Sequence, residues 1–201
     1  FNYHAPPTIA SIAPNFGGAS GGTSVTITGT NFVAGSTAVT IGGVAATSVN
    51  VLSSTTLTAV TPAHAAGAAN VVVTTPGGSA TLTGGFTYLG VPTIVSFTPS
   101  VGGTSGGQTV AITGTNFVAG STSVELGGMD FTSVNVINST TLTAVRPSQS
   151  PGGQDIRVTT PGGTARSSQN CGYGTSGCFT VYEPPLFTQH GSYPLGTVNP
   201  A

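Results

Sequence analysis

Residues 29–37 read Gly-Thr-Asn-Phe-Val-Ala-Gly-Ser-Thr, and residues 114–122 repeat that stretch without a change. The similarity extends outward in both directions with a constant offset of 85 positions and no gap. Between residues 7–80 and 92–165, about 46 of 74 aligned pairs are identical. Such a repeat indicates two tandem copies of one small domain. Duplicated modules commonly serve as spacers, stalks or binding arrays, so the repeat favours these roles over catalysis.

The chain carries very little charge. It has three basic and four acidic side chains and a formal net charge of -1 at pH 7, and residues 1–124 contain none of the seven. Nucleic-acid binding needs Lys and Arg to neutralise phosphates, and acid–base catalysis needs positioned titratable groups. The composition therefore argues against a nucleic-acid partner and against an enzyme. It also offers no set of residues for a catalytic centre, a cofactor or a metal.

Both copies read as all-β, because short runs rich in Val, Ile and Thr are separated by clusters of Gly, Pro and Ser. Apolar residues alternate with Thr inside the runs, which is the period of a strand with one buried face. Seven runs are expected as strands in the first copy, at residues 8–12, 24–28, 38–41, 47–51, 56–60, 70–74 and 85–88. This number is typical of an immunoglobulin-like sandwich. The predicted fold is two tandem sandwiches, at residues 7–90 and 91–183.

Several short motifs recur in order in both copies. In the first copy they are Pro-Thr-Ile at 7–9, Ser-Gly-Gly-Thr at 20–23, Gly-Thr-Asn-Phe at 29–32, Thr-Thr-Leu-Thr-Ala at 55–59 and Val-Thr-Thr-Pro-Gly-Gly at 73–78. This pattern resembles the TIG (also called IPT) domain family, over residues 7–88 and 92–182. The resemblance implies an early-set immunoglobulin-like sandwich for each copy.

Members of that family occur in bacterial surface and secreted proteins, beside the catalytic domains of starch-active enzymes, in plexin-type receptors and in some transcription factors. The family defines a fold rather than one chemistry. Its use in transcription factors depends on basic loops, which this chain lacks.

The second copy has an insertion of eight residues before its last strand, in the segment that holds both cysteines. Cys171 and Cys178 are close in sequence, which favours a disulfide and an oxidising, extracellular or cell-surface location; two free thiols are the alternative. We expect the bond to close an inserted hairpin. We also expect it to hold Tyr173 outward, as a contact for a sugar ring or a protein partner. A Tyr173 folded back on the sandwich is the alternative.

Two opposite charges appear together in the second copy. Glu125 stands where the first copy has Thr40, and Arg157 stands where it has Val72. Both positions are in the outward phase of their strands, and the third and sixth strands of an immunoglobulin-like sandwich are neighbours. We therefore expect Glu125 and Arg157 to form a cross-strand ion pair.

The two ends of the chain do not belong to either copy. Phe1-Asn2-Tyr3 aligns with Phe86-Thr87-Tyr88, the expected final strand of the first copy. Residues 1–6 are therefore interpreted as a spare final strand of a preceding repeat, or an arm, with Phe1 and Tyr3 free to dock on a neighbouring sandwich. A frayed end lying on the first copy is the alternative. Residues 184–201 are rich in proline and predict an extended tail. Because the chain starts with Phe1, we expect a processed form or a fragment.

Other motifs favour structural roles. The glycine-rich stretch at residues 17–22 precedes a strand and lacks the lysine of a phosphate-binding loop, so a plain turn is expected. His4, His64 and His190 are far apart and are expected at the surface or in packing. In Asn31-Phe32, repeated at residues 116–117, Phe is expected at the core edge and Asn is expected to hydrogen-bond local backbone.

These features favour a non-enzymatic extracellular structural or adhesive protein, whose repeats form part of a surface fibre, stalk or head-to-tail assembly. Its partners would be further copies of itself or neighbouring repeats, because low net charge removes long-range repulsion. The second hypothesis is a carbohydrate-binding accessory region of a secreted glycoside-active enzyme, with a glycan as partner. The absence of Trp speaks against it. No apolar run approaches the roughly 18 residues of a membrane-spanning helix, so no membrane span is expected.

Overall fold

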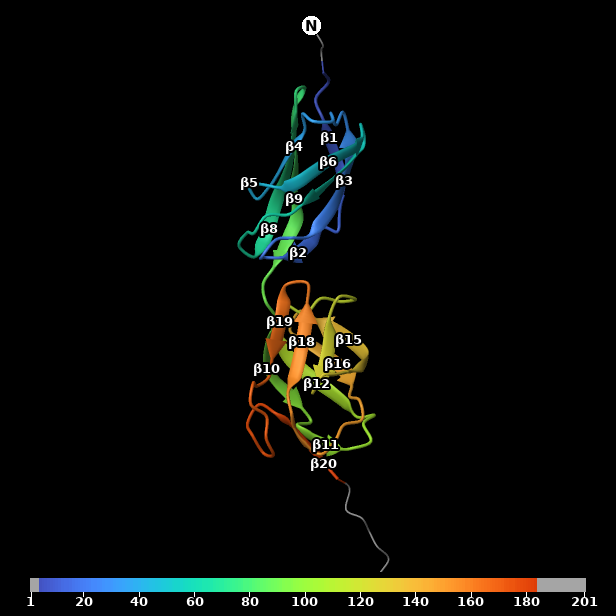
Figure 1. The fold of residues 1–201 in the computed structure, drawn as a ribbon, viewed down its shortest axis with the longest axis vertical. Coiled ribbons are helices and arrows are strands. Elements are labelled where there is room, and N and C mark those ends of the chain that lie inside the picture. Colours follow the sequence, from blue (N-terminus) through green and yellow to red (C-terminus); the bar gives the residue numbers. More distant parts are fainter. Residues whose placement is uncertain (1–3, 184–201) are drawn as a thin grey trace, which may run out of the picture.

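The computed structural model describes residues 4–183, which form two β-sandwiches placed end to end (Figure 1). All twenty elements in this range are strands. None of the residues described forms a helix long and apolar enough to cross a membrane. The predicted all-β fold, with two tandem immunoglobulin-like sandwiches, is confirmed.

The first sandwich packs a four-stranded sheet on a five-stranded one. Its strands are β1 (Thr8–Ala13), β2 (Phe16–Gly18), β3 (Ser24–Thr30), β4 (Ala38–Ile41), β5 (Val44–Ala45), β6 (Thr47–Ser53), β7 (Thr56–Val60), β8 (Gly67–Thr75) and β9 (Gly78–Leu89). The sheet orders are β1-β3-β7-β6 and β2-β9-β8-β4-β5. Only β2 and β9 run parallel, so the copy is otherwise antiparallel.

The second sandwich repeats this order, but its second sheet is split. Its strands are β10 (Thr93–Thr98), β11 (Val101–Gly103), β12 (Thr109–Thr115), β13 (Ser123–Leu126), β14 (Met129–Asp130), β15 (Thr132–Asn138), β16 (Thr141–Val145), β17 (Gly152–Gln154), β18 (Ile156–Thr160), β19 (Gly163–Arg166) and β20 (Phe179–Tyr182). One sheet is β10-β12-β16-β15, and the other layer consists of β14-β13-β18-β19 and β11-β20-β17.

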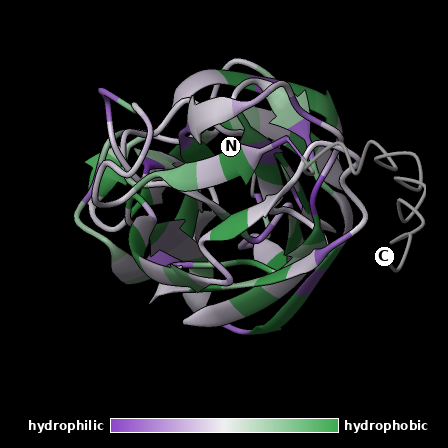
Figure 2. Cartoon of the chain, turned by 90° about the horizontal axis from the view of Figure 1, so that it is seen from below, coloured by the Kyte–Doolittle hydropathy of each residue, from purple (hydrophilic) through white to green (hydrophobic). Residues whose placement is uncertain are grey.

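The alternating sequence pattern produces a buried core in each copy. Val25 and Ile27 of β3, for example, are fully buried beside Leu57 of β7, while the threonines between them face outward. Each such buried side chain stabilises the fold by about 1.5–3 kcal/mol relative to an exposed one. Figure 2 shows the resulting bands of hydrophobic and less hydrophobic residues along the strands.

Outward-facing hydroxyls bond to one another across strands. Thr8 and Thr30 are joined through their Oγ1 atoms at 2.8 Å, and Ser11 and Thr28 through Oγ and Oγ1 at 2.7 Å, all between β1 and β3. These contacts take the place that charged pairs have on most sheet surfaces.

The glycine-rich stretch after β1 is more than the plain turn expected. Its first part is strand β2, which pairs in parallel with β9, from Phe16 opposite Thr87 to Gly18 opposite Leu89. Glycine is needed there because a Cβ on Gly17 would lie 2.2 Å from Oγ1 of Thr23. Since Gly is depleted in strands generally, sequence pattern alone does not reveal this strand.

The inserted segment of the second copy is not the predicted hairpin. Residues 167–178 contain no strand, and they connect β19, which pairs with β18, to β20, which pairs with β11 and β17. Gly174 and Gly177 have φ of 70° and 80° there, a left-handed conformation that is common in turns. The first copy lacks the insertion, and β9 continues as one strand from Gly78 to Leu89, with an irregularity in its pairing with β8 between Leu82 and Phe86.

Candidate functional site

The repeated Gly-Thr-Asn-Phe stretch holds the chain where it enters each sandwich. Asn31 donates from Nδ2 to the carbonyl oxygen of Pro6 at 2.8 Å, and Asn116 donates likewise to Val91 at 2.9 Å. The expected bond to local backbone is therefore wrong, since each acceptor lies 25 residues earlier. The reason is the register of β1 on β3, which places Thr8 opposite Thr30 and so brings the entering chain beside Asn31.

The glycine of the same stretch permits a close backbone approach. A Cβ on Gly29 would lie 1.9 Å from the carbonyl oxygen of Thr8, and a Cβ on Gly114 would lie 1.9 Å from that of Thr93. Phe32 and Phe117 are each 4% exposed and cover these glycines, as predicted for the core edge. The motif thus fixes the first strand and the segment before it.

The linker also crosses the Pro-Gly-Gly turn of the sandwich that it enters. A Cβ on Gly162 would lie 2.0 Å from the carbonyl oxygen of Gly90, and a Cβ on Gly77 would lie 2.2 Å from that of Ala5. The segment before the first copy therefore follows the same path as the linker between the copies.

The two copies touch directly at this turn. A Cβ on Gly18, in β2, would lie 2.7 Å from the carbonyl oxygen of Pro161 in the second copy. Gly103 is the equivalent of Gly18, and a Cβ there would meet no atom within 4 Å. Gly18 therefore belongs to a joint between the sandwiches, whereas Gly103 marks an open position at the far end of the second copy.

The predicted disulfide is present at that far end. The Sγ atoms of Cys171 and Cys178 are 2.06 Å apart. The loop between them has turn hydrogen bonds, from the amide of Thr175 to the carbonyl of Gly172 and from the amide of Cys178 to the carbonyl of Thr175. Cys178 is buried whereas Tyr173 is 62% exposed. The bond thus ties an exposed aromatic loop to the sandwich core.

Replacing both cysteines with alanine is expected to destabilise the second copy alone. The chain-entropy estimate for a loop of this size is about 2.5 kcal/mol. Urea unfolding, followed by NMR signals of each copy, should show an earlier midpoint for the second copy and an unchanged one for the first. Wild-type protein with its disulfide reduced serves as the control and should match the variant. Equal midpoints for variant and oxidised wild type would contradict the role given to the bond.

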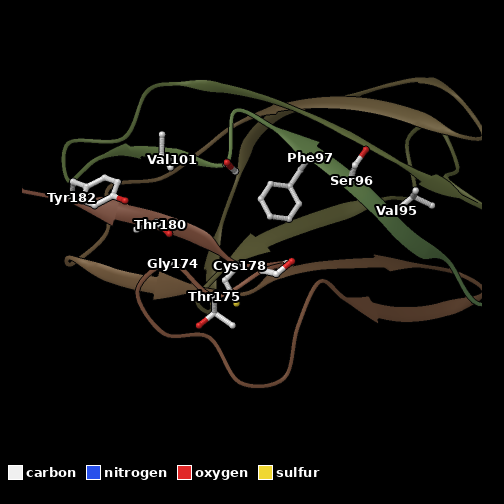
Figure 3. A pocket seen from close by; sticks show the side chains of 12 residues that line it. Val95, Ser96, Phe97, Val101, Gly174, Thr175, Cys178, Thr180 and Tyr182 are labelled. Carbon is white, nitrogen blue, oxygen red and sulfur yellow. The ribbon is translucent and has the colours of Figure 1, made fainter.

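A hollow of about 520 Å³ lies between β10, β11 and the disulfide loop (Figure 3). The Phe97 ring projects from β10 into it, toward Thr175 and Cys178. Tyr182, at the end of β20, also lines it and is 50% exposed. The ring centroids of Tyr182 and Tyr173 are 6.3 Å apart, with planes at 38°. None of the residues that line this hollow carries a charge.

Glu125 and Arg157 are direct partners in the register of β13 and β18. The Arg157 guanidinium donates from Nη2 to Oε2 of Glu125. This hydrogen bond and the Glu125 charge raise the pKa of Arg157 above its ordinary value. A second ion pair lies nearby, between Arg166 and Asp155 at 2.8 Å. Both pairs are at the surface, where such contacts add little to stability.

Arg146 is a buried cation, 3% exposed, close to the same far end. It donates from Nη2 to the carbonyl of Gly103, from Nη1 to that of Pro147 and from Nε to Oε1 of Gln108. Its Cζ lies 5.4 Å from the centroid of the Phe179 ring. Burial lowers the pKa of Arg146. Among the salt bridges of residues 4–183, none involves Arg146.

The first copy has Thr61 at the position of Arg146, and aromatic rings pack close to it. Tyr88, at the position of Val181, is buried, and His64 stacks on it with centroids 4.9 Å apart. His64 therefore has a packing role. Burial raises the pKa of the Tyr88 phenol, and neighbouring Thr61 lowers it. The Tyr88 hydroxyl and Thr61 nevertheless do not meet the geometry of a hydrogen bond, so the buried Tyr88 hydroxyl has no partner.

The remaining predicted residues are not drawn into a site. His4 is exposed. Within residues 4–183, no three His, Cys, Asp or Glu side chains gather as a metal ion would require. Phe1, Tyr3, His190 and the tail of residues 184–201 lie outside the described residues, so docking of residues 1–3 on a neighbour stays a prediction.

Sequence reasoning missed the hollow, although it singled out Tyr173 beside it. Val95, Phe97, Val101 and Tyr182 come from three separate segments, and no local motif joins them. A signal was present in the repeat: these residues stand where the first copy has Ala10, Ile12, Phe16 and Leu89. Positions at which the two copies differ in sequence therefore point to this surface.

The fold and the repeated motifs agree with one family. The model of the IPT/TIG domain matches residues 7–88 and matches again at residues 92–174. The chain belongs to the IPT/TIG domain family. Its two copies are tandem domains of that family, and the second match ends inside the disulfide loop. The chain matches no curated protein in sequence.

Solved structures share the fold of these IPT/TIG domains. The full extracellular region of plexin A4 overlaps with a TM-score of 0.57 at 23% identity, over 88% of this chain and 18% of that one. A second structure of the same region gives 0.53 at 26% identity, over 90% and 16%. The chain thus spans less than a fifth of those chains. SGBP-B, from a xyloglucan utilization locus in Bacteroides uniformis, overlaps with a TM-score of only 0.38 at 22% identity, over 87% of this chain and 49% of that one.

Proposed function

We propose that the two IPT/TIG domains, residues 7–90 and 91–183, form a non-enzymatic structural segment of an extracellular surface fibre, stalk or head-to-tail assembly. The observation that carries this proposal is the joint. In each copy the entering chain is held by the equivalent asparagine, Asn31 or Asn116, and crosses the equivalent Pro-Gly-Gly turn. A module that fixes its predecessor in one way suits a spacer of defined length.

Two further features support the proposal, one for the extracellular setting and one for the assembly. The disulfide between Cys171 and Cys178 suits an oxidising compartment, because cytosolic thiols are kept reduced. The near-absence of charge removes the long-range repulsion that keeps like proteins apart. Adjacent copies of such a segment therefore have little electrostatic barrier to close packing.

Replacing Gly18 with alanine is expected to loosen the joint and leave both sandwiches folded. The new methyl group would collide with the Pro161 carbonyl of the other copy, which can be relieved by moving one sandwich relative to the other. In ¹⁵N relaxation, the wild type should tumble as one elongated body, and Gly18→Ala should show two less coupled bodies. Gly103→Ala, at the equivalent open position, is the matched control and should behave as the wild type. Independent tumbling of the wild-type copies would overturn the spacer proposal.

Head-to-tail assembly is tested separately, on the full chain. Analytical ultracentrifugation at rising concentration and electron microscopy should show chains associating end to end, and Phe1→Ala with Tyr3→Ala should weaken that association. A monodisperse monomer at high concentration with no fibres would sink the assembly part. The spacer part would then still rest on the joint.

A further inference from the structure

The hollow beside the disulfide loop gathers several exposed apolar side chains of the second copy. Val95 of β10 is 73% exposed and Tyr182 of β20 is 50% exposed, and both line the hollow. Tyr173 is 62% exposed and lies next to Tyr182, with ring centroids 6.3 Å apart. Val101 of β11 completes the group at 45% exposure. Grouped apolar side chains at a surface mark an interaction site more often than scattered ones do.

Val95, Tyr173 and Tyr182 are gains of the second copy, whereas Val101 replaces the larger Phe16 of the first copy. The first copy makes the same sandwich with Ala10 and Leu89 in the places of Val95 and Tyr182. It also lacks the inserted residues that carry Tyr173. Since half or more of Tyr173 and Tyr182 is exposed, the added aromatic surface is not explained by packing in the core.

We propose that this hollow binds a ring of a neutral saccharide, with Tyr182 and Tyr173 as the aromatic surface under it. A sugar ring presents C–H groups on its faces and hydroxyls around its edge. The site offers both complements: the ring of Tyr182, extended by the adjacent ring of Tyr173, for the faces, and the hydroxyls of Ser96, Ser100 and Thr175 for the edge. A volume of about 520 Å³ falls within the range of small-ligand sites, about 300–1,000 Å³.

The absence of charge narrows the class of ligand. No lining residue is charged, so the hollow has no cation to pair with a phosphate, a sulfate or a uronic acid. Glu183 follows directly after Tyr182 and would repel an anion. Neutral hexose or pentose units fit this chemistry, and acidic glycans do not.

The disulfide prepares the site before a ligand arrives. Tyr173 stands two positions after Cys171, inside the loop that the bond closes. Its ring rests 6.3 Å from that of Tyr182, centroid to centroid, while β20 holds Tyr182 in the sheet. A pre-ordered pair of rings loses less conformational entropy on binding than two free side chains.

The test uses the full chain and isothermal titration calorimetry with cellohexaose, maltohexaose, mannohexaose, xylohexaose and oligogalacturonate. At least one neutral oligosaccharide should bind, and oligogalacturonate should not. Tyr182→Leu, which installs the residue of the first copy, and Tyr173→Ala should each weaken binding by about tenfold, the usual cost of losing one aromatic anchor. Tyr182→Phe keeps the ring and should retain most of the affinity.

A second measurement uses the wild type, so it does not depend on whether a variant folds. In the wild type, the ring signals of ¹³C-labelled Tyr173 and Tyr182 should shift on titration, while those of buried Tyr88 should not. The proposal is overturned by no binding of any neutral oligosaccharide at millimolar concentration, by binding of oligogalacturonate alone, or by affinity that survives both substitutions. Shifts confined to other parts of the chain would overturn it as well.

Discussion

Replacing Gly114 with alanine is expected to destabilise the second copy severely. The new Cβ would lie 1.9 Å from the Thr93 carbonyl oxygen and 2.7 Å from Cζ of Phe117. Backbone of a paired strand cannot move aside as the end of a flexible side chain can, so β10 must separate from β12 or the ring must leave the core. We expect a loss of about 3 kcal/mol, the upper end of the usual cost of overpacking.

The measurement is urea unfolding read separately for each copy. Gly114→Ala should move the transition of the second copy to lower urea and leave that of the first unchanged. Gly29→Ala should do the reverse, because the same contact exists at Thr8. Gly103→Ala is the control within the second copy, since its Cβ would meet nothing. If Gly114→Ala unfolds at the midpoint of the control, the close approach is not a constraint.

Replacing Arg146 with alanine is the second change expected to have a large effect. It would leave Gln108 and the carbonyls of Gly103 and Pro147 without a donor, and it would open a cavity against Phe179. Lost hydrogen bonds to a charged group and a cavity together suggest a cost of about 3 kcal/mol. The opposing effect is the penalty for burying an unpaired cation, which the three acceptors and the ring offset.

The first copy provides a rescue variant. Arg146→Thr with Val181→Tyr installs Thr61 and Tyr88 of the first copy at the equivalent places and should recover part of the loss. Arg146→Lys should recover little, because an ammonium cannot reach three separated acceptors as a guanidinium does. The readout is the urea midpoint of the second copy. A variant Arg146→Ala as stable as the wild type would mean that the burial penalty outweighs the contacts.

Most of the fold could be predicted because the repeat and the strand period constrain it strongly. The alternation in Val25 and Ile27 fixed which face of β3 is buried, and the same reasoning placed Glu125 and Arg157 outward on paired strands. What escaped prediction has no periodic signal. Two of the three residues of strand β2 are glycine, which by composition favours a turn, and the strand is specified by the lack of space for a Cβ at Gly17. The asparagine contacts escaped for a related reason, since they depend on register between distant segments.

The candidate site was only partly predictable. Cys171 and Cys178 are neighbours in sequence, so their pairing needed no knowledge of the fold. The hollow needs residues that only the folded sheet brings together, Phe97 from β10 and Tyr182 from β20. Sequence could show that these positions differ between the copies, but it could not show that they adjoin.

The hydroxyl-bearing face of the first copy has a consequence for its behaviour in different environments. Ionic screening acts on charges, and hydrogen bonds between hydroxyls such as those of Thr8 and Thr30 offer it nothing to act on. The first 124 residues also contain no Asp, Glu, Lys or Arg side chain whose charge salt could screen. A shaft built from such copies would keep the same dimensions in fresh water and in brine, so that what it carries stays at a constant distance from its base.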